Sequence, residues 1–482
     1  MAFIRKVRTK SGATAVQIVT KAHGEIVGID HLGSAHTDDE LTLLLGLARE
    51  RLRAGQLSLL DRPASLTLSL GHTVSGVLMD TLTDVYRRLG FDQLADDDFA
   101  ALCLARIVEP VSKLDSLRVL AELGVTGLSK DRLYRCLVRA VAQDYRATFA
   151  QCCVAQATQA GIRLLLYDVT TLYFEIQQED SYRKPGLSKE RRLEPQIVVG
   201  LLVDHRGFPL AVHSFEGNTA ETTTILPVLE QFRQAHQLPQ PVTVVADAGM
   251  LSTKNLEALT TAGYRYIVGA RLTKIPDVVV AAQATGAGLT DGQILTASAA
   301  DQRTIYQYRE KRAALDRRNI DKQVAKAERI VEGQTSSKRA RFVTVTAAKR
   351  RLNDALIARA KALAGVKGYV TNLNRPDHEI IAAYHQLWHV EASFRMSKSD
   401  LKARPIFHRK RDSIEAHLTV VFAALAVART IEDRTGLSIQ KFVKTIRPIR
   451  SGTIRLNGRE YQAVAEIPAP VQQLLKKLAA GH

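Results

Sequence analysis

Two aspartates lie in apolar stretches of this chain, where a charged side chain is unfavourable unless it has a structural or functional role. Asp168 lies inside the strand-like sequence LLLYDV, and Asp247 directly follows a second one, VTVVA. Burying a carboxylate costs free energy unless another group pairs with it. In α/β sheets, ligands bind at the carboxyl ends of the strands, where Asp247 is expected. A capped turn or a buried pair with an arginine would explain either aspartate alone, whereas the two together favour a metal site.

A third carboxylate, Glu391, is expected on a helix that runs from Tyr384 to Lys398. Tyr384 and Lys398 each lie seven residues from Glu391, and Arg395 lies four residues after it. These spacings place the four side chains on one helical face. A carboxylate flanked by a phenol and two cations suits a site that holds both metal and phosphate. The alternative is a solvated face with a Glu391–Arg395 ion pair, worth only about 0.3–0.5 kcal/mol.

The three carboxylates match the ligand preference of Mg²⁺, which binds oxygen donors, usually carboxylates together with phosphate and water. Two such ions, Mg²⁺ or Mn²⁺, held about 3.5–4 Å apart activate an attacking oxygen and stabilise a leaving one. The sequence contains no His/Cys cluster with the spacing of a zinc site. Other acids that could replace a ligand flank predicted turns, where acids are common, and these are Glu175, Asp204 and Glu216.

The charge of the chain points to a polyanionic partner. Lys and Arg number 67 against 49 Asp and Glu, which gives a net charge of +18 and a pI near 9.8. Nucleic acid is the first candidate for such a partner. Hydrophobic residues make up 46% and charged residues 24%, a balance typical of globular domains without long disorder.

Other sequence features argue against several classes of protein. The four cysteines form no CxxC pair, which argues against a zinc ribbon or a disulfide framework and indicates reduced thiols in a cytosolic protein. The N-terminal sequence MAFIRKVRTK has no secretion signal. The longest apolar run, Leu418–Ala428, is far shorter than the roughly 20 residues that span a bilayer, and it predicts a buried helix instead.

The N-terminal third predicts two small domains. Residues 1–60 begin with alternating apolar and polar positions, which predict a β meander, and a helix then begins at the capping box Thr37–Glu40 and ends at Gly55. Residues 66–160 lack strand signals, and residues 61–160 are expected to be helical. Within them, SLRVLAELG, the turn VTGLS and KDRLYRCLVRAVA resemble a helix-turn-helix that binds DNA, with simple helical packing as the alternative.

The rest of the chain predicts an α/β core. Residues 161–271 read as a strand, a two-strand hairpin, a helix, a strand, a helix and a strand. Residues 272–366 interrupt this order as an insertion, and the core resumes over 367–435 with the strand GYVTNL and two helices. This order predicts a mixed sheet with helices packed on it and resembles the ribonuclease-H-like fold. Residues 436–482 are a basic C-terminal segment, in which a strand pair and a last helix are expected.

Four segments resemble the DDE insertion-sequence transposases of the insertion-sequence-4-like group, and they are YDVTTLYFE, EGNTAETTTILP, VVADAGM and YHQLWHVEASFRMSK. The last segment fits the family's Y-x2-R-x3-E-x6-K signature at Tyr384, Glu391 and Lys398, but Leu387 occupies the arginine position. The resemblance covers about residues 160–435, and its motifs follow in the family's order.

The resemblance implies a role for each residue that matches a motif. Asp168, Asp247 and Glu391 would be the ligands of two Mg²⁺ or Mn²⁺ ions. Tyr384 and Lys398 would contact DNA phosphate near the cut end.

Three further residues near the signature have roles implied by their positions. Arg395 lies one turn after Glu391 and could also contact phosphate. Trp388 matches an aromatic residue near the transposon end in some relatives and could stack on an extruded base, although tryptophan more often packs in a core. Leu387 removes one expected phosphate contact, which Arg395 or His389 could replace.

The implied activity is hydrolysis of double-stranded DNA at the inverted-repeat ends of an insertion sequence, followed by attack of the freed 3′-OH on target DNA. The active complex is expected to be a homodimer or larger assembly in the bacterial cytoplasm, associated with the nucleoid. The basic loop 182–192, the charged helix 306–332 and the tail 439–459 are expected to hold phosphates, with solvated faces as the alternative. The alternative functions are a metal-dependent nuclease without strand transfer and a non-catalytic DNA-binding protein derived from a transposase.

Overall fold

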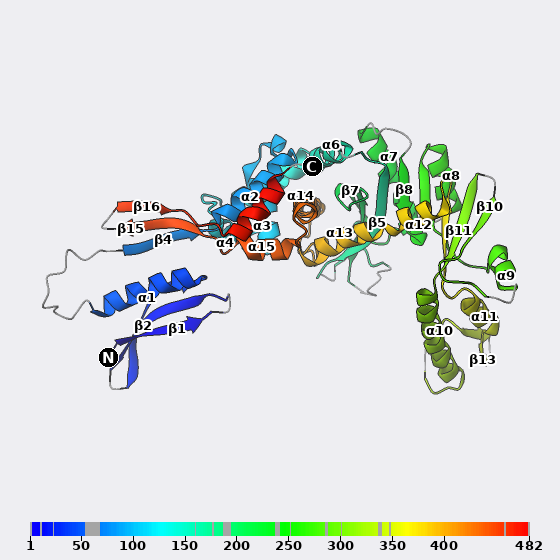
Figure 1. Cartoon of the computed structure of the whole chain (residues 1–482), viewed down its shortest axis with the longest axis horizontal. Helices are drawn as coiled ribbons and strands as arrows, with labels where there is room; N and C mark the ends of the chain where they lie inside the picture. The colour runs from blue at the N-terminus through cyan, green and yellow to red at the C-terminus, as the bar shows by residue number, and fades with distance from the viewer. Residues whose placement is uncertain are drawn as a thin grey trace. The chain divides into compact units, whose positions relative to one another are not determined.

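The chain divides into two compact units in its computed structural model (Figure 1). The first unit comprises Met1–Cys136 and Thr430–His482, and the second comprises Leu137–Arg429. The structure describes residues 2–9, 12–22, 24–53, 68–159, 161–175, 178–186, 194–236, 242–250, 252–284, 288–299, 301–335, 340–346, 349–456 and 459–480.

An eight-stranded mixed sheet forms the centre of the second unit, with strand order β10-β11-β14-β9-β8-β5-β6-β7. Its β5–β8 and β8–β9 pairs are parallel and the other pairs are antiparallel. The mixed α/β class predicted from the sequence is therefore confirmed. The strands are β5 (Leu164–Tyr173), β6 (Gln196–Val203), β7 (Pro209–Glu216), β8 (Thr243–Ala246), β9 (Arg265–Gly269), β10 (Ile294–Ala299), β11 (Gln302–Tyr308) and β14 (Val366–Thr371).

Helices cover both faces of this sheet. Successive side chains of a strand point to opposite sides, so apolar side chains on each face pack against a layer of helices. On one face, Tyr167 and Val169 of β5 share a buried core with side chains of α7 and α8. On the other face, Thr170 and Leu172 lie against α13 and α14. The helices of this unit that pack around the sheet are α6 (Tyr145–Gln159), α7 (Ile225–Ala235), α8 (Thr253–Thr261), α12 (Asp377–His385), α13 (Trp388–Ser399) and α14 (Arg411–Thr435).

Helix α14 confirms the helix predicted from the apolar run 418–428, since every residue of that run is buried. By length and composition α14 could cross a membrane, but most of its apolar stretch is buried inside the protein, as in the core helix of a folded domain.

The segment 272–366, predicted as an insertion, contributes two strands to the sheet. β10 and β11 form a hairpin, and β11 pairs with β14. The other part of the segment has a small core of its own, in which Ile320 and Ala327 of α10 contact Phe342 and Ala360. The boundaries at 272 and 366 stay a prediction. The remaining elements are α9 (Asp277–Ala284), α10 (Glu310–Val331), β12 (Val343–Thr346), β13 (Lys349–Leu352) and α11 (Asp354–Ala362).

The first unit begins with the predicted three-stranded meander of β1 (Ala2–Arg8), β2 (Thr14–Ala22) and β3 (Glu25–Ala35). Helix α1 (Asp38–Arg53) follows, and its capping box is confirmed, because Glu40 N donates to Thr37 Oγ1 at 3.2 Å. The predicted end of this helix at Gly55 lies outside the described residues.

The expectation that residues 61–160 lack strands is wrong. β4 (Leu68–Val74) pairs antiparallel with β15 (Ser451–Leu456), which also pairs with β16 (Arg459–Ala463). The helices predicted in this unit and in the tail are present, and the DNA-binding role of the α4–α5 pair stays a prediction. These helices are α2 (Gly76–Arg88), α3 (Asp97–Val108), α4 (Ser116–Glu122), α5 (Lys130–Ala142), α15 (Ile439–Ile446) and α16 (Ala469–Ala479).

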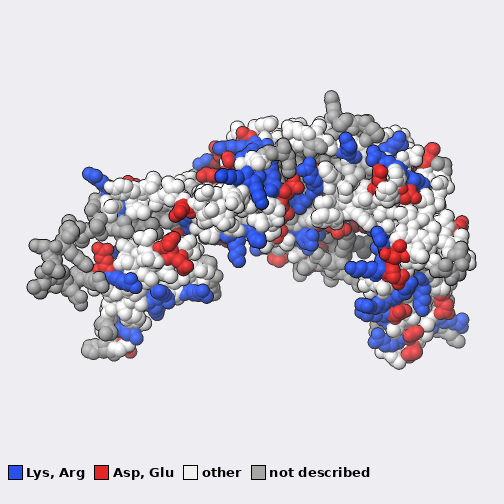
Figure 2. All heavy atoms as spheres, in the orientation of Figure 1, with Lys and Arg blue, Asp and Glu red and all other residues white. Residues whose placement is uncertain are grey.

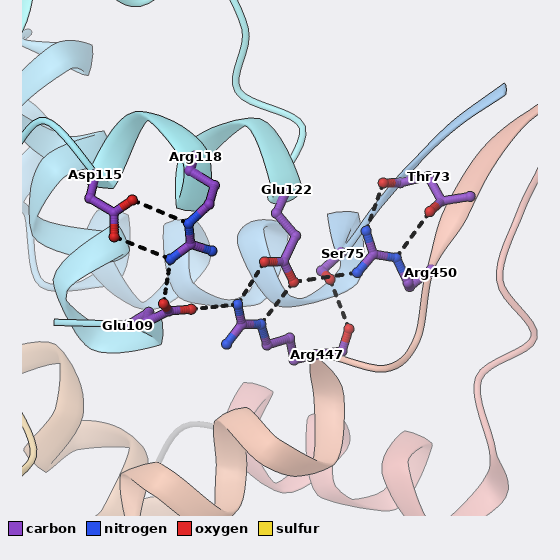
Figure 3. A network of polar contacts seen from close by, with 8 residues as sticks. All are labelled: Thr73, Ser75, Glu109, Asp115, Arg118, Glu122, Arg447 and Arg450. Atoms are coloured by element: carbon purple, nitrogen blue, oxygen red, sulfur yellow. Dashed lines mark hydrogen bonds and ion pairs between the residues drawn. The ribbon is translucent and has the colours of Figure 1, made fainter. Parts of the chain in front are cut away.

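An ion network attaches the C-terminal segment to the helices of the first unit (Figure 3). Arg447 Nη2 lies 2.6 Å from Glu122 Oε2 and 2.7 Å from Glu109 Oε2. Arg450 adds an ion pair to Glu122 at 3.3 Å and a hydrogen bond to the Thr73 carbonyl at 2.8 Å. These two tail arginines, expected to hold phosphates, are therefore engaged with carboxylates of their own chain.

Candidate active site at the strand ends

The two aspartates singled out in the sequence lie at the same level on neighbouring parallel strands. Tyr167 of β5 pairs with Ala246 of β8, so the next residues, Asp168 and Asp247, are also neighbours across the strands. Adjacent strands are about 4.8 Å apart, which brings the two residues close together at the carboxyl end of β8, although β5 continues beyond Asp168 to Tyr173. Asp168 is half-buried and Asp247 is exposed.

The helix predicted from Tyr384 to Lys398 is divided between two helices, α12 and α13, separated at Gln386 and Leu387. Leu387 N bonds to the Tyr384 carbonyl, and Val390 N bonds to the Leu387 carbonyl, both at 3.1 Å. These three-residue hydrogen bonds tighten the turn and change the phase of the helix. The expected single helix is therefore wrong, and Tyr384 is buried whereas Glu391 and Arg395 are exposed.

All three carboxylates line a single cavity. Asp168, Asp247 and Glu391 line a space of about 200 Å³, and the other lining residues are Lys367, Tyr384, His385, Leu387, Trp388 and Val390. The donors are all carboxylate oxygens, the ligand type that Mg²⁺ prefers, so the donor chemistry fits this ion. Within the described ranges, no three acidic, histidine or cysteine side chains are close enough together to hold a metal ion.

Tyr384 orients one of these carboxylates. Its hydroxyl donates a hydrogen bond to Asp247 Oδ1 at 3.0 Å, and its ring packs edge-on against Tyr369, with 4.9 Å between centroids. Burial raises the pKa of Tyr384 far above its usual range, and the Asp247 charge raises it further, so the phenol stays a donor. Gly269 permits this contact, because a Cβ there would lie 2.6 Å from the Tyr384 hydroxyl oxygen.

Arg271 is a second supporting residue that the sequence analysis missed. Its Nε donates to the Ala248 carbonyl at 2.8 Å, and its Nη2 donates to the Gly249 carbonyl at 2.9 Å. The guanidinium therefore holds the backbone that immediately follows Asp247. Nothing local in the sequence indicated this role, because Arg271 follows β9, a different strand.

Lys367 is a further residue of the cavity that the sequence analysis missed. It lies on β14, and its Nζ is 4.4 Å from the centroid of the Tyr384 ring. Burial and then the charge of Arg312 lower the pKa of Lys367, while the charges of Asp247 and Glu391 oppose that shift. A charged residue in an apolar strand was the signal used for Asp168, and the same signal was present in the sequence VKGYVT.

The residues predicted to contact DNA lie in different surroundings. Trp388 lines the cavity and is 56% exposed, so core packing was the wrong alternative for it. Tyr384 also lines the cavity but is 3% exposed. Arg395 is exposed on α13, outside the lining of the cavity, and Lys398 lines a separate space of about 30 Å³ with Thr170 and other residues. The DNA contacts of all four residues stay predictions.

The acids ranked as weaker alternatives are outside this cavity. Asp204 stabilises the hairpin turn by accepting from Arg206 N at 2.9 Å and Phe208 N at 2.8 Å. Glu216 forms an ion pair with Lys184, and Glu175 is exposed.

A mixed sheet with an acidic cavity at its strand ends, in a strongly basic chain, indicates an enzyme of the phosphodiester-cutting class. The chain belongs to the transposase DDE domain family, whose model matches residues 159–427, more than half of the chain and a range that includes all three carboxylates. It is therefore a transposase of the DDE type, as the sequence motifs predicted.

Solved transposase structures show more distant similarity. A piggyBac transposase synaptic complex with hairpin DNA is 11% identical, with 74% of this chain and 70% of that chain covered and a TM-score of 0.41. A Mos1 transposase paired-end complex with the left transposon end is 15% identical, with 51% of this chain and 69% of that chain covered and a TM-score of 0.17. The comparison with curated proteins finds no match.

Proposed function

We propose that this transposase binds the inverted-repeat ends of its own insertion sequence, cuts the DNA there and joins the freed 3′ ends to target DNA. The observation that supports the proposal most is that Asp168, Asp247 and Glu391 line one cavity within the matched domain. We also propose that the core is ribonuclease-H-like and that the chain belongs to the insertion-sequence-4-like group, on the strength of its strand order and its motifs.

In this proposal Asp168, Asp247 and Glu391 hold two Mg²⁺ or Mn²⁺ ions, which when bound activate an attacking oxygen and stabilise the leaving one. Tyr384 keeps the Asp247 carboxylate oriented through its hydrogen bond, and Arg271 holds the backbone beside it. Hydrogen bonds that orient metal ligands typically affect affinity or activity by about 10–100-fold.

Contacts with DNA would come from residues in and near the cavity. We propose that Trp388, exposed at the cavity and next to the His389 ring at 3.8 Å between centroids, stacks on a base extruded at the insertion-sequence end. Arg395 and Lys398 on α13, with Tyr384, would contact phosphates.

The charged segments would add contacts that depend on salt. Figure 2 shows many basic side chains over the α10 region, with acidic ones among them. Part of this charge is paired within α10, as in the Arg317–Glu310 pair at 3.0 Å and the Arg312–Asp316 pair at 3.5 Å. The loop 182–192 is described only up to residue 186.

Two DNA ends must meet to be joined at one target, so we propose that the active complex is a homodimer or larger. Sedimentation of the protein with and without end DNA tests this proposal, and a monomer with one bound end would contradict it.

We also propose that the protein acts in the bacterial cytoplasm, at the nucleoid. Fractionation of cells that express the tagged full chain tests this location, and recovery outside the nucleoid-containing fraction would contradict it.

The site is tested by cleavage of labelled DNA that carries the insertion-sequence ends, with Mg²⁺ or Mn²⁺. The wild-type protein is expected to nick these ends, and Asp247→Asn is expected to bind them with unchanged affinity and to cut about 100-fold more slowly or not at all, because a metal ligand is weakened. If Asp247→Asn cuts as well as wild type, the site assignment is wrong.

Two further readouts use the same DNA. Trp388 is the only tryptophan of the chain, and its fluorescence should be quenched when end DNA binds if it stacks on an extruded base, whereas end DNA with an abasic terminal position should leave it bright. Equal quenching by intact and abasic DNA would contradict the stacking role. Product analysis separates the alternative functions, because a nuclease gives cut ends without joined products, and a non-catalytic DNA-binding protein gives neither.

A further inference from the structure

Lys367 is a cation inside the acidic cavity that the family motifs do not include. Its strand, β14, lies beside β9, and Tyr369 pairs with Gly269, which is level with Asp247. Lys367 lies two residues before Tyr369 and therefore on the same face of the sheet. This face is the one on which the Tyr384 hydroxyl meets Asp247.

Two aromatic rings hold the side chain of Lys367 in this place. Its Nζ lies 4.4 Å from the centroid of Tyr384 and 5.7 Å from that of Tyr369. A cation over ring faces at these distances is attracted to them, and Lys367 is only half-exposed. Its ammonium is thus kept at the cavity, where Asp247 and Glu391 both act on it electrostatically.

The neighbouring histidine does not supply a competing positive charge. His385 lines the same cavity, and its Nε2 lies 3.3 Å from the Tyr369 hydroxyl. Burial and then the charge of Lys367 lower the pKa of His385 below its ordinary value, so the imidazole is neutral near pH 7. Among the residues that line this cavity, Lys367 is the one with a positive charge.

We propose that the ammonium of Lys367 balances the charge of the carboxylates in the DNA-free protein and thereby weakens the binding of divalent cations until DNA is present. A positive charge near a metal site repels a cation, and a phosphate that enters the cavity offsets this repulsion by attracting the ammonium. Loading of metal is then coupled to loading of DNA. This inference rests on the proposed function, since it takes the three carboxylates as metal ligands.

The test is titration of the DNA-free, full-length protein with MnCl₂, followed by electron paramagnetic resonance of the free ion. Lys367→Gln is expected to bind Mn²⁺ about tenfold more tightly than wild type, because a like charge is removed. Lys367→Arg, which keeps the charge, is expected to stay within about twofold of wild type. Lys254→Gln is the control for net charge, because Lys254 is exposed on α8 in the same unit, and it should also have little effect.

The outcomes separate this inference from the proposed function. If Asp247→Asn lowers Mn²⁺ affinity but Lys367→Gln leaves it unchanged or lowers it, Lys367 has no such role and the metal site stands. If Asp247→Asn binds Mn²⁺ as tightly as wild type does, the carboxylates are not the ligands, and the inference and the proposed site both fail. Circular dichroism melting of each variant verifies that the fold is retained.

Discussion

At the scale of single residues, the geometry around Asp247 depends on a residue with no side chain. Gly269 is the last residue of β9. The Tyr384 hydroxyl lies close to it and donates a hydrogen bond to Asp247. A methyl group at this position would occupy the space of the hydroxyl oxygen and would also approach Ala248 N to 3.0 Å. Both the donor to Asp247 and the backbone after Asp247 would then have to move.

Gly269→Ala is therefore expected to reduce cleavage of end DNA by about 10–100-fold, the usual cost of losing an orienting hydrogen bond. End binding, measured by fluorescence anisotropy, should change little. Gly46→Ala is the matched control, because Gly46 is exposed within α1 and an added Cβ meets nothing within 4 Å. Normal cleavage by Gly269→Ala would show that the Tyr384–Asp247 contact is dispensable.

At the scale of secondary-structure elements, long-range pairing joins segments that the sequence alone does not relate. β15 adds to β4, and α15 leads into the arginines that meet Glu109 and Glu122. Burial alone would raise the pKa of Glu122, but its hydrogen bonds and charge interaction with Arg447 outweigh burial and hold the pKa below its ordinary value. The network thus stabilises the first unit at neutral pH.

Arg447→Met is expected to destabilise the first unit by about 2–3 kcal/mol, because it leaves two partly buried carboxylates without their shared partner. Urea unfolding, followed by a probe attached to the first unit, measures this loss. Lys444→Met is the control, since Lys444 is an exposed cation on the adjacent helix α15. A loss of the same size in both variants would mean that general charge, and not this network, is responsible.

At the scale of the whole molecule, acid is expected to affect the two units through different groups. The carboxyl pKa values of Glu109 and Glu122 are lowered in the first unit, so their contribution is present above about pH 4.5 and is lost as the pH falls through their folded values. In the second unit, burial and then Arg146 lower the pKa of His213 from 6.5 to about 4. The unfolded chain therefore binds a proton at His213 below about pH 6.5, whereas the folded chain does so only near pH 4.

The second unit is accordingly expected to lose about 2–3 kcal/mol of stability from His213 between about pH 6.5 and pH 4. His213→Gln should remove this part of the pH dependence, measured as the difference in melting temperature between the two pH values. His378→Gln, at an exposed histidine of the same unit, is the control. Parallel pH profiles of wild type and His213→Gln would contradict the assignment.

Local sequence patterns determined several of the secondary-structure elements of this protein and the positions of its candidate site residues. Asp168 within one apolar strand and Asp247 directly after another located both positions at the sheet, because strand periodicity and the cost of a buried charge are local properties. The capping residue Thr37 marked a real helix start, since it accepts from Glu40 N at 3.2 Å. The family motifs led to the three carboxylates that share the cavity.

Tertiary structure alone decided the rest, because the interactions concerned join positions far apart in the chain. The tight turn at Leu387, the pairing of β4 with β15 and the entry of β10 and β11 into the sheet have no local signature. The cavity acquires its cation because β14, the strand of Lys367, pairs antiparallel with β9, a strand about a hundred residues earlier. A short stretch of sequence indicates the secondary structure that its residues favour. Which distant side chains share one cavity follows only from the packing of the whole sheet.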